Sequence, residues 1–297
     1  MKTLDARTRV QLKNILFTTD FSAAAAAALP CAGALAKRFG AKLFALHVRT
    51  PVINPMTPPE GWPALVKAAA EEDRERKESL RNALPGVETT VLIEEGDIGA
   101  HLPATVKKEH IDLIVLGTRG RTGMGKLMLG SGAEEILRTA ECPVLTVGPL
   151  APGIPAKYRE FTRILYATSF GCEIPAAAAY AISLAQEFQA DLTLLHVLPE
   201  PQVGEFVVPQ DLMESSKRRL AHLLPPEAEM WCVPEVCVER GNVAEKILDV
   251  AKRRNADLIV LGIRKPTGVP GAATHLPIAT AHKVVSHAHC PVLTVRD

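Results

Sequence analysis

Residues 112–117 read DLIVLG, and the same six letters return at 257–262. The run is apolar from its second to its fifth residue, as expected of a central strand in a parallel sheet, where helices cover both faces. A glycine ends each run, and glycine commonly marks the boundary between a strand and a loop. The stretch therefore predicts an α/β fold, and its recurrence predicts that this fold is present twice.

Three further segments repeat in the same order along the chain. They are KNILFTTDFS at 13–22 and TRILYATSFG at 162–171, LFALHV at 43–48 and LTLLHV at 192–197, and CPVLTV at 142–147 and 290–295. Such ordered landmarks indicate two copies of one domain. The Pro- and Gly-rich linker at 148–160 cannot continue a strand or helix. We therefore expect a first domain at 1–150 and a second at 160–297.

Within each copy, short apolar runs alternate with helical patterns, which indicates βαβ units around a parallel sheet. In the first copy we expect strands near 14–19, 42–48, 88–94, 111–117 and 143–148, and helices near 63–84 and 131–140. The predicted fold is two tandem doubly wound, Rossmann-like sheets of five parallel strands. Such sheets usually place the first strand beside the fourth or the third, and we expect the order 3-2-1-4-5 in each copy.

In that order the fifth strand is an edge, whose unpaired backbone groups invite a partner. The CPVLTV strand of one copy, at 143–148, can pair with that of the other, at 291–295. The chain would then be an intrachain pseudo-dimer, and a homodimer would use another surface.

The composition agrees with two globular domains and excludes some classes of binding partner. The chain has 297 residues, of which 47% are hydrophobic and 23% charged, and its formal net charge is +1. That balance argues against nucleic acid and anionic membrane as partners. The N-terminus lacks the apolar core of a signal peptide, and no apolar run reaches the length of about 18 residues that a membrane helix needs. We expect a cytoplasmic protein. The six cysteines show no CxxC pair, which favours reduced thiols over a metal site.

A glycine-rich loop, GTRGRTGMGKLMLGS at 117–131, directly follows the first DLIVLG strand. From Gly120 it spells the P-loop frame G-x-x-x-x-G-K, but Leu127 stands where Ser or Thr should hold magnesium. In the predicted order the winding reverses between strands 1 and 4, so Asp20 and Gly117 would face each other across the ligand crevice. The loop's position favours a nucleotide site and disfavours a P-loop.

A second spacing fits the same loop, namely G117-xx-G120, nine residues, then G130-S131. With it the sequence resembles the universal stress protein family, whose nucleotide-binding members carry that motif. ILFTTDFS, ALHV, EEGD, DLIVLGTRG and CPVLTV stand where the family has its landmarks. The resemblance spans both copies. It implies a tandem universal stress protein, similar in fold to adenine-nucleotide alpha-hydrolases, that acts as an ATP-binding regulatory module with Mg²⁺ assisting.

The resemblance also implies how ATP would be held. Asp20 and the backbone of Val48 would hold the nucleoside, and the motif's glycines and Ser131 would hold the phosphates. The residue chemistry agrees, because glycines let backbone N–H groups approach an anion and a helix beginning at Ser131 would direct its positive dipole end towards it. Arg119, Arg121 and Lys126 could neutralise phosphate charge. The candidate set is Thr18, Thr19, Asp20, Val48, Gly117, Arg119, Gly120, Arg121, Lys126, Gly130, Ser131 and Gly132.

Gly132 departs from the family pattern, which has an apolar residue there, most often Val. This departure would loosen the phosphate end. Structural interpretations compete with the functional ones. Ser131 with Glu134 could form a capping box, Asp20 could cap the Ala-rich helix that follows it, and His47 and His196 could be core or edge histidines.

The second copy lacks the candidate residues. Aligned on CPV, Gly130-Ser131 correspond to Ile278-Ala279, while Asp20 corresponds to Ser169 and Gly120 to Lys265. We therefore expect one ATP site per chain.

Two other functions remain open at this point. The chain could be an ATPase or nucleotidyl-transfer enzyme on the same fold, or a scaffold that binds no nucleotide. Hydrolysis needs a positioned base, and the predicted crevice offers only Asp20. We expect no dedicated catalytic or metal-ligating residue and at most slow ATP hydrolysis.

Overall fold

A computed structural model of the chain describes residues 10–51, 58–118, 129–148, 150–151, 161–170, 176–200, 210–226, 232, 234–263 and 278–296. The strands of the first copy are β1 (Asn14–Thr18), β2 (Lys42–Arg49), β3 (Thr89–Glu95), β4 (Leu113–Gly117) and β5 (Val144–Val147). Its helices are α1 (Ala23–Phe39), the short 3-10 turn η1 (Pro59–Gly61), α2 (Trp62–Asn82), α3 (Ile98–Lys108) and α4 (Ser131–Thr139).

The second copy repeats this alternation of strands and helices. Its strands are β6 (Arg163–Ala167), β7 (Asp191–Leu198), β8 (Glu235–Arg240), β9 (Leu258–Ile263) and β10 (Val292–Arg296). Its helices are α5 (Ala176–Phe188), α6 (Gln210–Ala221), α7 (Val243–Arg253) and α8 (Ile278–His287).

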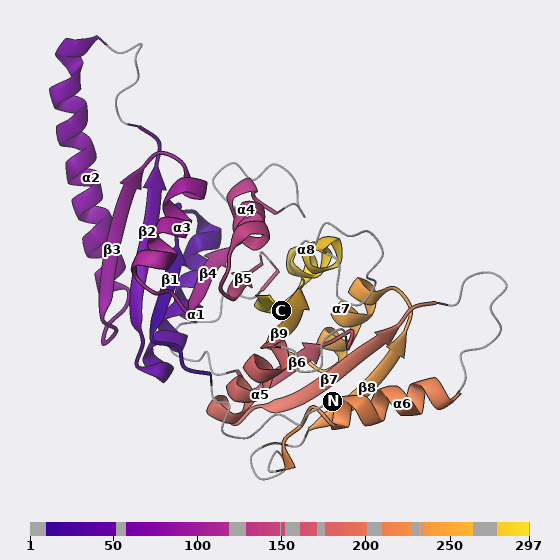
Figure 1. The fold of residues 1–297 in the computed structure, drawn as a ribbon. Helices are drawn as coiled ribbons and strands as arrows, with labels where there is room; N and C mark the ends of the chain where they lie inside the picture. Colours follow the sequence, from indigo (N-terminus) through magenta and orange to yellow (C-terminus); the bar gives the residue numbers. More distant parts are fainter. Residues whose placement is uncertain are drawn as a thin grey trace.

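The described strands form one ten-stranded sheet in the order β3-β2-β1-β4-β5-β10-β9-β6-β7-β8. Each half has the predicted order 3-2-1-4-5, and all pairs within a half are parallel. The halves meet at β5 and β10, which are antiparallel, as Figure 1 shows at the centre of the molecule. The predicted pairing of the two CPVLTV strands is therefore confirmed.

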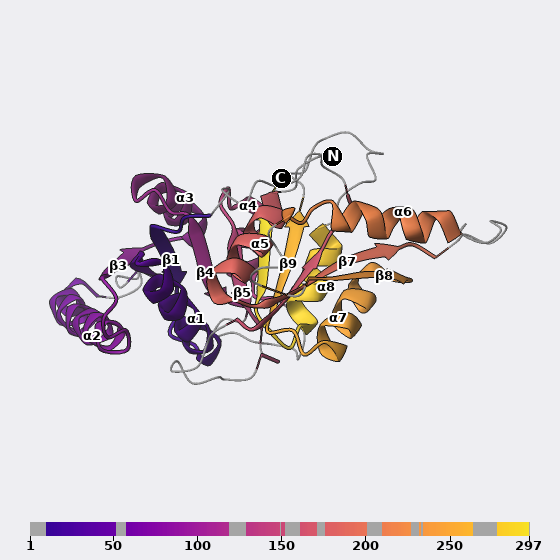
Figure 2. The same ribbon diagram turned by 90° about the horizontal axis from the view of Figure 1, so that it is seen from below.

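Helices cover both faces of the sheet in each copy (Figure 2), because the strands are apolar on both sides. One hydrophobic cluster combines residues of α1 and α5 with the sheet, and the other combines residues of α3, α4, α7 and α8 with its opposite face. Both clusters contain residues from the two copies, so the core continues across the β5–β10 junction. No helix among the described residues is long and apolar enough to cross a membrane.

Threonine side chains reinforce the β5–β10 junction reciprocally. Thr146 Oγ1 donates a hydrogen bond to the Val292 carbonyl (3.1 Å), and Thr294 Oγ1 donates one to the Val144 carbonyl (3.2 Å). Both threonines are buried. Each hydroxyl is satisfied only in the presence of the other copy, so the repeated sequence CPVLTV encodes a self-complementary interface.

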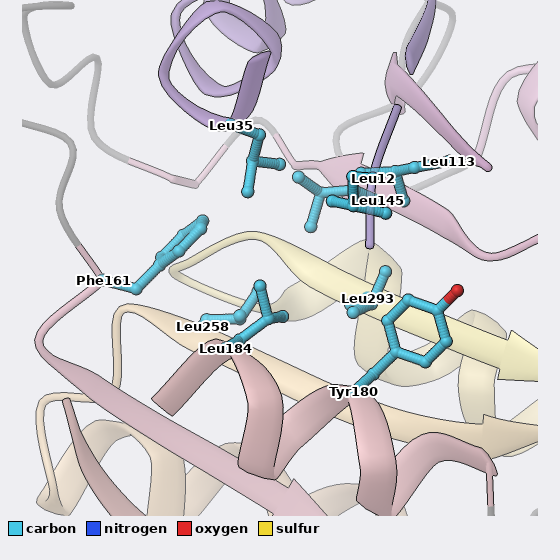
Figure 3. Close-up of a pocket in the computed structure, with 9 residues that line it drawn as sticks. All are labelled: Leu12, Leu35, Leu113, Leu145, Phe161, Tyr180, Leu184, Leu258 and Leu293. Carbon is cyan, nitrogen blue, oxygen red and sulfur yellow. The ribbon is translucent and has the colours of Figure 1, made fainter. Parts of the chain in front are cut away.

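A small apolar cavity lies at this junction (Figure 3). Its lining combines equivalent positions of the two copies with Tyr180, whose pKa burial raises to about 12. The equivalent pairs are Leu12 and Phe161, Leu35 and Leu184, Leu113 and Leu258, and Leu145 and Leu293. Its free volume for a water-sized molecule is about 10 Å³, the lower limit for a single water, and apolar cavities stay dry. The two copies thus pack against each other at the β5–β10 junction in one continuous core.

Candidate functional site

The carboxyl ends of β1, β2 and β4 lie next to one another at one edge of the sheet. Thr18, the last residue of β1, is in register with Leu46 of β2 on one side and Leu116 of β4 on the other. The candidate residues Asp20 and Gly117 follow directly along the chain. Parallel strands bring their ends to the same edge, so Asp20 and Gly117 lie at one edge of the sheet, where the ligand crevice is predicted.

The backbone of Val48 is directed towards that crevice. In β2, Lys42 N donates to Lys13 O beside β1, whereas Leu43 N donates to Glu88 O beside β3. Backbone polar groups alternate between the two neighbouring strands, so the even-numbered residues of β2 face β1. At Leu46, the carbonyl still accepts from Thr19 N (2.9 Å). Val48 lies two residues further on, past the end of β1, and its N–H and C=O therefore point into the space beyond that strand.

Helix α4 begins beside the end of β4. Thr118 N donates to Val147 O (3.0 Å), and Gly130 N donates to Thr118 O (2.9 Å), so the chain that leaves β4 at Thr118 returns to it at Gly130. The next residue, Ser131, is the first of α4. This pair of hydrogen bonds brings the helix start to the crevice. It also occupies the Gly130 N–H, which is then unavailable to a ligand.

The capping-box interpretation of Ser131 is wrong. Gly130, not Ser131, is the N-cap of α4, and among the residues that the structure describes no side chain caps this helix end. Helix starts carry backbone N–H groups without an intrahelical partner. Because Gly130 has no side chain to satisfy them, the N-terminus of α4 keeps its capacity for an anion. Gly132 lies in the first turn, and a Cβ there would be 3.9 Å from Ile98 Cγ2, an ordinary contact.

Gly117 has a packing role that the motif did not indicate. A Cβ at this position would lie 2.5 Å from the carbonyl oxygen of Ala24 and 2.8 Å from the amide nitrogen of Ala25. These are backbone atoms of α1, which cannot move aside as a flexible side chain can. Glycine at 117 therefore lets α1 approach β4 closely, whether or not a ligand is bound.

The turn after β1 has its own network. Ser22, rather than Asp20, is the N-cap of α1 and accepts from Ala25 N (3.2 Å), so the expected capping role of Asp20 is wrong. Asp20 Oδ1 instead accepts from Ser22 N (3.0 Å), and Thr19 Oγ1 accepts from Phe21 N (3.0 Å). Phe21 has a left-handed φ of 59°, an unusual conformation for a bulky residue. The turn is thus held by several contacts.

The side chain of His47 contacts the turn after β1 at Thr19 and Phe21. Its side chain is buried, with Nδ1 2.8 Å from Thr19 O and its ring edge-on to Phe21 at 4.8 Å. Arg76 of α2 lies over Phe21 at 4.9 Å and places its guanidinium 3.5 Å from His47 Nε2. Burial first and Arg76 second lower the pKa of His47. The neutral ring donates Nδ1–H to Thr19 O and accepts at Nε2.

The second copy has the same arrangement. His196 Nδ1 lies 2.8 Å from Thr168 O, Phe170 has a φ of 60°, and Arg219 lies over the Phe170 ring at 4.1 Å. Burial lowers the pKa of His196 as well. This copy lacks the counterpart of Asp20 and keeps the same contacts, which indicates that the histidine supports the turn in both copies. His47 is buried and His196 is half-buried. The sequence did not indicate the roles of Arg76 and Arg219, because the two arginines stand at different distances along the chain from the repeated LHV segments.

Four candidate residues lie outside the described residues: Arg119, Gly120, Arg121 and Lys126. The same holds for Lys265 of the second copy. Within the described ranges, no group of three His, Cys, Asp or Glu side chains could hold a metal ion. Of the described candidates, Thr18 ends β1 and Thr19 supports the turn after it. Asp20, Val48, Ser131 and Gly132 lie on the segments that meet at this edge of the sheet.

Comparison with known proteins agrees with the fold and the repeat. The Universal stress protein family matches residues 11–148 and 160–296. A universal stress protein of Mycolicibacterium smegmatis is 26% identical over 302 residues, covering 95% of this chain and 96% of that protein. One from Thermus aquaticus is 36% identical over 137 residues, 46% of this chain and 98% of that protein.

A solved structure has the same overall fold. The crystal structure of a universal stress protein from Archaeoglobus fulgidus superimposes with a TM-score of 0.68, at 21% identity, covering 97% of this chain and 99% of that one. The likeness extends over both copies, so the arrangement of two linked domains is shared as well.

Proposed function

This chain belongs to the universal stress protein family, and we propose that it is a regulatory protein of the stress response that binds ATP at one site. The site lies in the first copy, residues 1–150, and the second, residues 160–297, has none of this kind. The observation that carries the proposal is the pair of hydrogen bonds through Thr118 and Gly130. It brings an uncapped helix start to the crevice at the ends of β1, β2 and β4.

The nucleoside would bind at the β1–β2 side of the crevice. The backbone N–H and C=O of Val48 point there, and a base or sugar can exchange hydrogen bonds with both. Asp20 would accept hydrogen bonds from the nucleoside, because a carboxylate offers about four acceptor positions and its bond from Ser22 N uses one of them.

The phosphates would bind at the β4–α4 side. We assign this end to the Ser131 hydroxyl and the amides of Ser131 and Gly132, since the Gly130 amide is already paired with Thr118. A helix N-terminus favours an anion through its free N–H groups and its dipole. Gly117 and Gly120 would allow close approach of the loop, and Arg119, Arg121 and Lys126 would supply positive charge. Mg²⁺ would be held chiefly by the phosphates.

The second copy supports a single site. Ile278 and Ala279 replace Gly130 and Ser131, and Ser169 replaces Asp20. Neither alanine nor isoleucine offers a side-chain hydroxyl to a phosphate. Asp20 is the acidic residue that we assign to the site, and its proposed role is to hold the nucleoside, so we expect binding rather than dedicated hydrolysis. ATP occupancy would act on conformation or assembly, and a homodimer would use a surface other than the β5–β10 junction.

Calorimetric titration of the full chain with MgATP tests the proposal. We expect a stoichiometry near one. Asp20→Ala should weaken binding by about 10- to 100-fold, because it removes hydrogen bonds to a charged group. Ser169→Ala, at the equivalent position, is the matched control and should bind as the wild type does. Two equal sites, or no heat at millimolar ATP, would contradict the proposal.

A further inference from the structure

The last strand of each copy ends against the last helix of the other copy, β10 against α4 and β5 against α8. Arg296 of β10 donates a hydrogen bond from its guanidinium to the Leu137 carbonyl of α4 (2.5 Å), across 159 residues of sequence. At the equivalent place on the other side, Gly148 follows β5, and a Cβ there would lie 3.3 Å from the Val285 carbonyl of α8.

These two contacts are equivalent in position but differ in chemistry. Leu137 and Val285 occupy matching places in the last turns of α4 and α8, as do Arg296 and Gly148 after the strands. Glycine brings only its backbone to α8, whereas arginine brings a positive charge and hydrogen-bond donors to α4. The helix that carries the proposed phosphate contacts is thus the one that receives the cation.

Helix α4 depends on such contacts for its order. It has nine residues, and a helix of that length is marginal on its own. Its N-cap is Gly130, which contributes no side-chain cap. At its C-terminal end, Ala140 N pairs with the Ile136 carbonyl, and the Leu137 carbonyl would lack a partner within the helix. Arg296 satisfies that carbonyl and places its charge at the negative end of the helix dipole.

We propose that Arg296, supplied by the second copy, is a positioning residue for the phosphate end of the ATP site in the first copy. It does not touch the ligand. It holds α4 at its C-terminal end and so keeps Ser131 and the first-turn amides in place beside β4. This gives the second copy a function although it has lost the site motif itself. The inference rests on the proposed function for its ligand, but its structural part concerns α4 alone.

Two measurements on the full chain test the inference, with Arg296→Met as the main variant. Without nucleotide, hydrogen exchange of the α4 amides should be about three- to ten-fold faster in Arg296→Met than in the wild type. With nucleotide, the affinity for ATP should fall by about three- to ten-fold, while the affinity for adenosine, which reaches only the Asp20 end, should not change. Arg296→Lys should restore part of both, since lysine keeps the charge and a donor.

The control and the contrary outcomes separate the two proposals. Arg240→Met removes one positive charge from the exposed end of β8 and should change neither measurement. If Arg296→Met exchanges and binds ATP like the wild type, or if it loses ATP and adenosine equally, the positioning role is wrong. If Arg296→Met does not fold, the same comparison is made with Arg296→Lys. Faster α4 exchange together with a smaller, selective loss of ATP affinity would support the role, whereas wild-type behaviour or an equal loss of both ligands would overturn it. A wild type that binds no ATP refutes the proposed function, whereas the exchange result still reports on the contact between Arg296 and α4.

Discussion

Replacing Leu145 or Leu293 with alanine should weaken the junction between the copies strongly and by similar amounts. The two side chains face each other in the β5–β10 register, are 1% and 3% exposed, and both line the apolar cavity. Each substitution removes three carbon atoms, worth about 2.4 kcal/mol at about 0.8 kcal/mol per buried methylene. Neighbouring side chains already leave a void there, so they should not collapse into a larger one. With the added cavity cost we expect about 3 to 5 kcal/mol for each variant.

Urea denaturation of the full chain, followed by circular dichroism and fluorescence, measures this loss. The two signals should change together, because the core continues through the junction and the copies should unfold as one unit. Benzene should raise the stability of each variant more than that of the wild type, since enlarged apolar cavities bind it. Leu150→Ala is the control. Its side chain is 42% exposed, so its effect should stay within about 0.5 kcal/mol.

Two results would refute this reasoning. A loss below about 1 kcal/mol in either variant would mean that the junction relaxes freely, contrary to the close packing of protein interiors. If the losses in free energy of unfolding differed by more than about 2 kcal/mol between Leu145→Ala and Leu293→Ala, the two equivalent positions would not be packed alike at the junction.

Three further predictions concern the site and its supports. Gly117→Val should lower the free energy of unfolding by about 3 kcal/mol, because its side chain meets the backbone of α1; wild-type stability in urea would disprove the packing role. Gly132→Ala should raise the free energy of unfolding by about 0.5 kcal/mol through helix propensity, since the added methyl makes only an ordinary contact. A lower free energy of unfolding would show that the first turn of α4 has no room for the methyl group. Stability should fall as the pH drops below 6.5, the ordinary pKa of histidine, because His47 and His196 have lowered pKa values in the fold and only the unfolded chain takes up the protons. The slope of stability against pH should become shallower in His47→Gln, and an unchanged slope would assign the effect to other groups.

Much of the fold could be predicted because its signals are local and occur twice. Apolar runs such as DLIVLG identify buried parallel strands wherever they stand, and their repetition in order identifies two domains without any knowledge of contacts. The junction was also predictable. A strand at the edge of a sheet needs a partner, and the identical CPVLTV strand of the other copy is complementary to it.

The candidate site was predictable only as a set of segments. The spacing from Gly117 to Ser131 places a helix start after a strand, but it does not say which backbone groups are already paired. The Gly130 amide, assigned to phosphate from the motif, donates to Thr118 instead. Ser131 and Glu134 have the letters of a capping box, yet the helix begins one residue earlier than that box requires, with Gly130 as its N-cap.

The sequence by itself determined the α/β class and the duplication, because periodicity and repetition act over short stretches and each is read without reference to distant residues. The strand order and the pairing of the two CPVLTV strands were predicted from the general rules of doubly wound sheets and of sheet edges, and the structure confirmed them. Only the tertiary structure decided why Gly117 must be glycine, which arginine accompanies each buried histidine, and that Arg296 reaches α4. Each of these depends on how closely two elements approach after the sheet has formed. Arg296 and Leu137 are 159 residues apart, and nothing in the neighbourhood of either residue along the chain indicates the other.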